Sequence, residues 1–208
     1  MAITGYTTFL ITSLLFIMSP GIDTIFILNK SILQGEKSGI FATLGITTGV
    51  LVHTTFAAFG LSLILAQSAL AFNIVKYAGA AYLIYLGISK LISPESLVQQ
   101  KENTPLTSLR RTFTSAVLTN TLNPKVAIFF LAFFPQFIEP AYLHSAKPFI
   151  FLGITYAMIG MLWFIKLTIF AGSFSHKLNG NPSFSKWLNR FSAIAFILMG
   201  IKIIFTKR

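Results

Sequence analysis

Cysteine is absent from this 208-residue chain. Disulfide bonds, thiolate metal ligands and thiol nucleophiles are therefore excluded. Acidic residues are also scarce: the chain has five Asp and Glu in all, and charged residues of both signs make up 10% of it. A soluble domain averages about 25% charged residues. Because so little polar surface cannot cover a globule in water, the scarcity of charge favours a membrane protein over a soluble one.

Motifs for nucleotide binding and hydrolysis are missing too. The segment GEKSG at 35–39 contains Lys-Ser but lacks the Gly-x4-Gly-Lys spacing of a P-loop. Neither HExxH nor GxSxG occurs, so the sequence identifies no hydrolytic metal centre and no serine nucleophile. We therefore expect no enzymatic activity, no cofactor and no resident metal, and any transport has to follow an ion gradient or run downhill.

Basic residues outnumber acidic ones, and the formal net charge is +11. In a soluble protein this excess would suggest nucleic acid as a partner. Here the basic residues fall mostly between apolar segments, as in loops that face anionic lipid. We expect the lipid bilayer as a partner and no nucleic acid.

Six apolar segments are long enough to cross a bilayer, which takes about 20 helical residues. They are 3–28, 39–66, 69–92, 113–138, 148–173 and 190–206. The connections on one side hold nine basic residues, Lys30, Lys37, Lys90, Lys101, Arg110, Arg111, Lys177, Lys186 and Arg190, and the other side holds three, Lys147, Lys207 and Arg208. Because Lys and Arg concentrate in cytoplasmic loops, both termini are predicted to lie outside the cell.

The two halves of the chain resemble each other at an offset of 104 residues. This offset superposes Phe9 on Phe113, Leu14 on Leu118, Pro20 on Pro124 and Gly49 on Gly153. Each half has three spans, so the second copy has to insert upside down relative to the first. We predict an all-α membrane protein built from two inverted three-helix repeats, 1–92 and 113–208, joined by a cytoplasmic linker at 93–112.

The first span contains two helix breakers and an acid within an apolar run. Pro20 lacks an N–H, Gly21 lets the backbone unwind, and Asp23 stands two residues after Gly21. A helix can break at membrane depth only where the freed backbone groups face protein or a watery cavity. Two interpretations remain open: a cavity-lining site, or a proline kink whose carboxylate binds a neighbouring helix.

The fourth span repeats this pattern with Asn120, Asn123, Pro124 and Lys125. The asparagines can satisfy freed backbone groups or bind the charged groups of a zwitterion. Lys125 is a candidate counter-charge to Asp23, because two buried opposite charges cost less together than apart. A purely structural pair is the alternative.

Two other polar residues in spans are secondary candidates. His53 can relay protons or make a helix–helix hydrogen bond. Lys166 can join a site or extend its ammonium to the cytoplasmic interface. Gly45 and Gly49 form a GxxxG motif, for which packing inside the bundle and a homodimer contact both remain open.

Taken together, several motifs resemble those of the LysE/RhtB family of bacterial amino-acid exporters. They are SPGIDTIFIL, GEKSGIFATLGITTGVLVH and VKYAGAAYLIYLG in the first half and LTNTLNPKVAIFFLAFFPQFI in the second. The resemblance covers nearly all of the chain and weakens in 93–111 and after about residue 150. Ile22 stands where the family pattern has a second proline, so the first break is expected to be milder here.

This resemblance implies a carrier of the bacterial inner membrane that expels amino acids in exchange for protons. Its overall similarity is to the homoserine, threonine and neutral amino-acid exporters rather than to the lysine exporters. In this hypothesis Asp23 accepts the proton and pairs with the substrate ammonium, while Lys125, a half-helix N-terminus, Asn120 and Asn123 hold the carboxylate. The alternatives are a carrier of divalent metal ions from the same superfamily and a membrane scaffold that transports nothing.

Overall fold

The computed structural model describes residues 2–61, 69–92, 107–171 and 182–205, and these ranges are helical apart from short turns and one isolated bridge between Ile3 and Ile138. The helices are α1 Tyr6–Met18, α2 Ile22–Gln34, α3 Glu36–Phe56, α5 Ala69–Ile92, α6 Leu109–Thr121, α7 Pro124–Ile128, α8 Ala146–Ile169 and α10 Pro182–Phe205. A π-helical turn, Ala57–Leu61, extends α3. A second, Phe129–Phe133, extends α7 and leads into the 3₁₀ turn Phe134–Phe137, with another 3₁₀ turn at Pro140–Tyr142.

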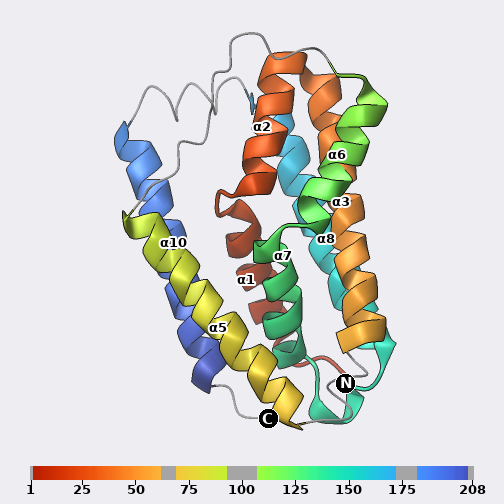
Figure 1. Cartoon of the computed structure of the whole chain (residues 1–208), viewed down its shortest axis with the longest axis vertical. Helices are drawn as coiled ribbons and strands as arrows, with labels where there is room; N and C mark the ends of the chain where they lie inside the picture. Colours follow the sequence, from red (N-terminus) through yellow and green to blue (C-terminus); the bar gives the residue numbers. More distant parts are fainter. Residues whose placement is uncertain (1, 62–68, 93–106, 172–181, 206–208) are drawn as a thin grey trace.

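Two of the apolar segments are bent pairs of half-helices. The α1 helix ends at Met18, α2 begins at Ile22, and the two axes differ by 55°. Pro20 and Gly21 occupy the interruption, and Gly21 is fully extended. In Figure 1 the chain turns sharply between α1 and α2 at this point.

The second bend has the same form, but its proline has a different role. The α6 helix ends at Thr121, and the axis changes by 47° before the chain continues as Pro124–Phe137. Pro124 is the first residue of α7 rather than the point of interruption, which lies at Leu122 and Asn123. Proline suits this position because the first helical N–H has no partner inside the helix.

The spans of the described residues are fewer than the six predicted from sequence. Two straight helices, Glu36–Gly60 and Ala146–Ile169, are long and apolar enough to cross a membrane, and the two bent pairs bring the number to four. Helices α5 and α10 have 24 residues each. With the α-helical rise of about 1.5 Å per residue, each is about 36 Å long. The six-span arrangement stays a prediction.

Several helices begin earlier or end later than the apolar segments suggested. The α2 helix continues to Gln34, and α10 begins at Pro182, eight residues before the expected span at 190. Within the expected linker 93–112, residues 93–106 lie outside the described part of the chain. At the end of this linker α6 begins at Leu109, where the Ser108 side chain caps the helix by accepting from Arg111 N at 3.3 Å. The domain bounds stay a prediction. Hydropathy marks the lipid-buried part of a helix and misses its polar ends.

Helices α5 and α10 lie side by side and set apart from most of the bundle (Figure 1). Glycines allow this contact: a Cβ on Gly87 would lie 2.8 Å from the carbonyl oxygen of Ala193, and one on Gly200 the same distance from that of Ala80. The pair touches the other helices mainly through the π-helical turn after α7, where Gly79 faces Ala132.

The GxxxG motif is used inside the chain. A Cβ on Gly45 would lie 2.5 Å from that of Ala116, and one on Gly49 would lie 2.7 Å from the Asn120 side chain, so α3 packs closely on α6. On α8, Gly153 meets Thr54 in the same close way. Since these glycines are occupied by contacts within the chain, they need no dimer partner to explain them.

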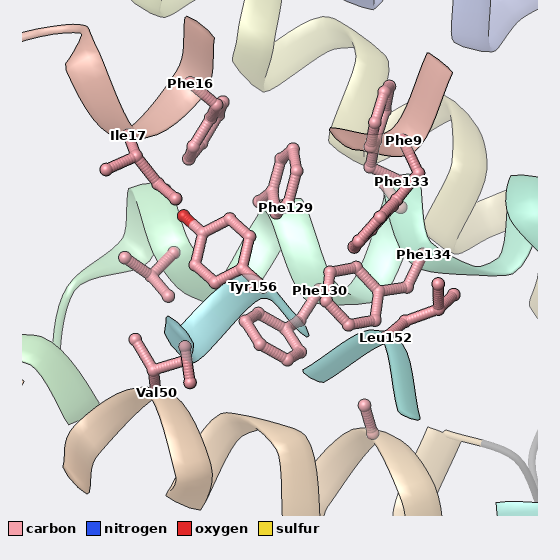
Figure 2. Close-up of a cluster of buried hydrophobic side chains, with 14 of the residues drawn as sticks. Phe9, Phe16, Ile17, Val50, Phe129, Phe130, Phe133, Phe134, Leu152 and Tyr156 are labelled. Atoms are coloured by element: carbon pink, nitrogen blue, oxygen red, sulfur yellow. The ribbon is translucent and has the colours of Figure 1, made fainter. Parts of the chain in front are cut away.

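Phenylalanine rings fill the interior between the half-helices and α8 (Figure 2). The Phe129 ring lies 4.2 Å from that of Phe16, 4.9 Å from that of Phe133 and 5.0 Å from that of Tyr156. All four side chains are at most 4% exposed. This aromatic cluster joins α1 and α8 to the π-helical turn that follows α7 (Figure 2).

Candidate functional site

The two breaks meet around a small buried cavity. Its polar wall contains all four residues singled out from sequence as a substrate site: Asp23, Asn120, Asn123 and Lys125. The cavity has a volume of about 20 Å³ for the centre of a water molecule, which is room for about one water. Asp23 and Asn120 come from different bent pairs, so the site exists only because α2 and α6 lie against each other.

Asp23 stands in the first turn of α2 and is buried. Its Oδ2 accepts a 2.8 Å hydrogen bond from the side-chain amide of Asn120, and the Asn123 side chain also faces the carboxylate. The other carboxylate oxygen, Oδ1, has no hydrogen-bond partner among the described residues, and the same holds for Oδ1 of Asn120. A buried acceptor left unsatisfied is costly, by about 1–3 kcal/mol. Both residues line the cavity, so a donor placed there can satisfy the Asp23 oxygen.

Asn123 is the capping residue of α7. Its side-chain oxygen accepts from the backbone N–H of Lys125 at 3.0 Å, and its own N–H donates to the carbonyl of Asn120 at 2.9 Å. These bonds satisfy backbone groups that the break in the fourth apolar segment sets free. No side chain caps α2 in this way, so its first turn offers N–H groups at the edge of the cavity.

Lys125 reaches across from α7 to the end of α1. Its ammonium donates to the carbonyl of Ser19 at 2.8 Å and to that of Phe16 at 3.2 Å. A cation suits this position because the C-terminal carbonyls of a helix carry partial negative charge. The side chain passes over Gly21, where a Cβ would lie 3.4 Å from Nζ. Both charges line the cavity, and the pairing of Lys125 with Asp23 stays a prediction.

The two secondary candidates lie in very different places. His53 is buried on α3, and its Nε2 lies 3.0 Å from the carbonyl oxygen of Asn120. Its ring stacks on Phe130, with 5.7 Å between centroids. Lys166 is exposed in the last turn of α8 and does not line the cavity. The structure therefore brings His53 next to the four principal residues and leaves Lys166 away from them.

One wall of the cavity was missed by the sequence analysis. Along α8, Tyr156, Ala157, Gly160 and Phe164 face the cavity. Their spacing is that of one helical face. Tyr156 is buried, and its hydroxyl points toward Ile17 (Figure 2). An aromatic or a glycine in a long apolar run carries no signal of its own, so only the rotation of α8 in the bundle shows which face is involved.

A second cavity of about 110 Å³ adjoins the first on the side of α5 and α10. Gly21, Asn123 and Lys125 line both cavities, and Tyr82, Ser89 and Phe196 complete the outer wall of the second. The ammonium of Lys125 lies 5.1 Å from the centre of the Phe196 ring. Lys125 therefore forms part of the partition between the two spaces.

The arrangement suits a small zwitterion better than a metal ion. The cavity combines a carboxylate and an amide oxygen that can accept from an ammonium group with a lysine and a helix start that can bind a carboxylate. In the described part of the chain, no three His, Cys, Asp or Glu side chains gather as metal ligands would.

Comparison with known proteins gives consistent matches over almost the whole chain. The family model described as LysE type translocator matches residues 14–207. The homoserine/homoserine lactone efflux protein of Salmonella typhimurium (strain LT2) is 34% identical over 92% of this chain and 92% of its own. The leucine efflux protein of the same strain is 27% identical over 93% and 91%. An uncharacterized membrane protein of Vibrio cholerae is 30% identical over 97% of both chains. No solved structure matches the chain significantly.

Proposed function

Because the chain belongs to the LysE type translocator family, we propose that it exports neutral amino acids across the bacterial inner membrane in exchange for protons. The observation that carries this proposal is the pair of unsatisfied acceptor oxygens, on Asp23 and Asn120, in a cavity between two broken helices. The names of two relatives, efflux proteins for homoserine and for leucine, support a neutral amino acid as substrate.

The substrate ammonium binds at the Asp23 end of the cavity. An ammonium group has three N–H donors, and the free oxygens of Asp23 and Asn120 can take two of them. The negative charge of Asp23 adds attraction in surroundings from which water is largely excluded. This part of the site would accept any α-amino acid, because it contacts only the α-ammonium group that all of them share.

The substrate carboxylate binds on the other side of the cavity. Lys125 supplies a positive charge there, and the uncapped first turn of α2 supplies N–H groups and the positive end of a helix dipole. Asn123 lies between these groups and Asp23 and can donate from its side-chain amide. Half-helix ends that face a substrate carboxylate are a recurrent feature of secondary transporters.

Proton exchange follows from the position of Asp23. When this carboxylate takes up a proton from outside, it loses its charge and its hold on the ammonium weakens, so substrate leaves outward. When the proton leaves on the cytoplasmic side, the charge returns and the next substrate binds. This coupling needs a single carboxylate exposed in turn to the two sides.

The bent pairs support an inverted-repeat frame for such alternating access. Pro20 and Pro124, which match at the repeat offset of 104, each lie at a bend. Gly49 on α3 and Gly153 on α8 match at the same offset. Each allows a close contact with a neighbouring helix, Gly49 with Asn120 and Gly153 with Thr54. We infer that α5 and α10 complete the two repeats as the third and sixth spans, with both termini outside.

Transport by purified protein in proteoliposomes tests the proposal. Vesicles loaded with labelled threonine, homoserine or leucine should release the label faster when a proton gradient is imposed. Asp23→Asn should fold normally and lose gradient-driven export, whereas Glu36→Gln, which removes an exposed acid from the start of α3, should keep it. Export by Asp23→Asn at the normal rate and with normal proton dependence would show that the coupling role is wrong. Protein-dependent movement of Mn²⁺ or Zn²⁺ without amino-acid movement would favour the metal carrier instead.

A further inference from the structure

Gly160 on α8 faces the cavity, and no close helix contact requires a glycine there. At Gly39, Gly45, Gly49, Gly79, Gly87, Gly153 and Gly200, an added Cβ would come closer than 3.0 Å to a neighbouring atom, so close packing accounts for each of them. A Cβ on Gly160 would meet one atom, Cδ1 of Ile17, at an ordinary 3.8 Å. Glycine in a helix costs about 1 kcal/mol relative to alanine, and packing gives no reason for that cost here.

Gly160 lies between two aromatic side chains of the cavity wall and leaves a gap between them. Tyr156 precedes it by one helical turn and Phe164 follows it by one turn, and both rings line the cavity. Between them Ala157 and Gly160 present almost no side chain. On α8 the two aromatic rings therefore extend into the cavity, and the helix leaves space between them at the point opposite Ile17.

The opposite wall holds the groups that suit an amino-acid backbone. Asp23 and Asn120 both line the cavity, and the buried Oδ1 of Asp23 has no hydrogen-bond partner among the described residues, an observation independent of the glycine. A ligand held at that wall by its ammonium and carboxylate has to place its side chain among the remaining lining groups. Those groups are apolar apart from Thr24, Thr47 and the Tyr156 hydroxyl.

We propose that Gly160 and Ile17 form the side-chain subsite of the transporter and set the upper size limit of its substrate. The subsite takes a short aliphatic or hydroxylated side chain and rejects aromatic and charged ones. This inference rests on the proposed function, because it assigns the part of the substrate that the proposed backbone contacts leave free. It adds one prediction: selection among amino acids by the size of their side chains depends on α8.

Three variants of the full-length protein test this assignment in proteoliposomes. Gly160→Ala should narrow the subsite, so that the ratio of leucine to alanine export falls roughly tenfold, the lower end of the effect of one methylene in a binding pocket. Gly160→Val should lower this ratio further. Ile17→Ala should change it in the opposite direction. Gly60→Ala is the matched control, because Gly60 is an exposed helical glycine where a Cβ meets nothing within 4 Å.

The outcomes separate this inference from the proposed function. If the unaltered protein exports none of the amino acids, the proposed function fails. If it exports them and Gly160→Ala changes the leucine-to-alanine ratio no more than Gly60→Ala does, the subsite is wrong while the function stands. A uniform loss of all substrates would also overturn the subsite. If Gly160→Val does not fold, the opposed ratios of Gly160→Ala and Ile17→Ala still decide.

Discussion

Removal of the Lys125 ammonium provides a strong test of how the two bent pairs are held together. In Lys125→Met the side chain keeps a similar length, but the bonds to the carbonyls of Ser19 and Phe16 are lost. A hydrogen bond to a charged group contributes about 1.5–3 kcal/mol, and the carbonyls left behind are shielded from water by the surrounding rings. We therefore expect the free energy of unfolding to fall by about 3–5 kcal/mol, the range found when one partner is removed from a buried charge pair.

The assay is thermal unfolding of the purified protein in detergent. For a chain of this size, each 1 kcal/mol lowers the melting temperature by about 2–4 °C, so a fall of about 10 °C is expected. Lys166→Met is the control, because it makes the same chemical change at an exposed position on α8 and should leave the melting temperature almost unaltered. Adding Asp23→Asn to Lys125→Met should restore part of the loss, since a buried carboxylate is then no longer left without its cation. Equal melting temperatures for Lys125→Met and Lys166→Met would refute the idea that the bonds from Lys125 to the carbonyls of Phe16 and Ser19 hold α7 to α1.

Two further changes address packing beside the site. Gly49→Ala places a Cβ 2.7 Å from the Asn120 side chain. It should push the Asn120 amide away from Asp23, lower the free energy of unfolding by about 1–3 kcal/mol and lower amino-acid export. A melting temperature equal to that of the unaltered protein would contradict this. Phe129→Ala removes a fully buried ring at the centre of the aromatic cluster and should lower the free energy of unfolding by about 3–5 kcal/mol. Phe56→Ala, at a position 64% exposed, is its control, and a similar loss in both variants would argue against a tightly packed cluster.

The broken helices could be predicted because their cause is local. Proline and glycine act on the backbone wherever they stand, so Pro20 and Gly21 were sufficient to predict an interruption before Asp23. The second break lies directly before Pro124, at Leu122 and Asn123, since proline interrupts a helix in its interior but is well placed at its start. Whether Pro124 lies inside a helix or begins one depends on the Asn123 cap, and a cap is visible only in the folded backbone.

The partners of the charged residues could be predicted only in part. Opposite charges in an apolar chain suggest that Lys125 lies near Asp23, and both residues line the same cavity. The carbonyls of Phe16 and Ser19 could not be identified in this way, because every residue has a carbonyl and the break alone decides which are free. Tyr156 and Gly160 were missed for a related reason: the packing of α8, not its composition, determines the face it turns to the cavity.

The cavity beside Asp23 has room for about one water, and even the smallest amino acid is larger than a water molecule. The conformation described here has no room for an amino acid, so a substrate of the proposed exporter has to bind a rarer and more open arrangement of the helices. Its measured dissociation constant will equal the intrinsic value divided by the fraction of molecules already in that arrangement. A search for inhibitors that scores compounds by their fit to the conformation described here would discard the best ones, and mutations far from the cavity can change affinity simply by altering how often it opens.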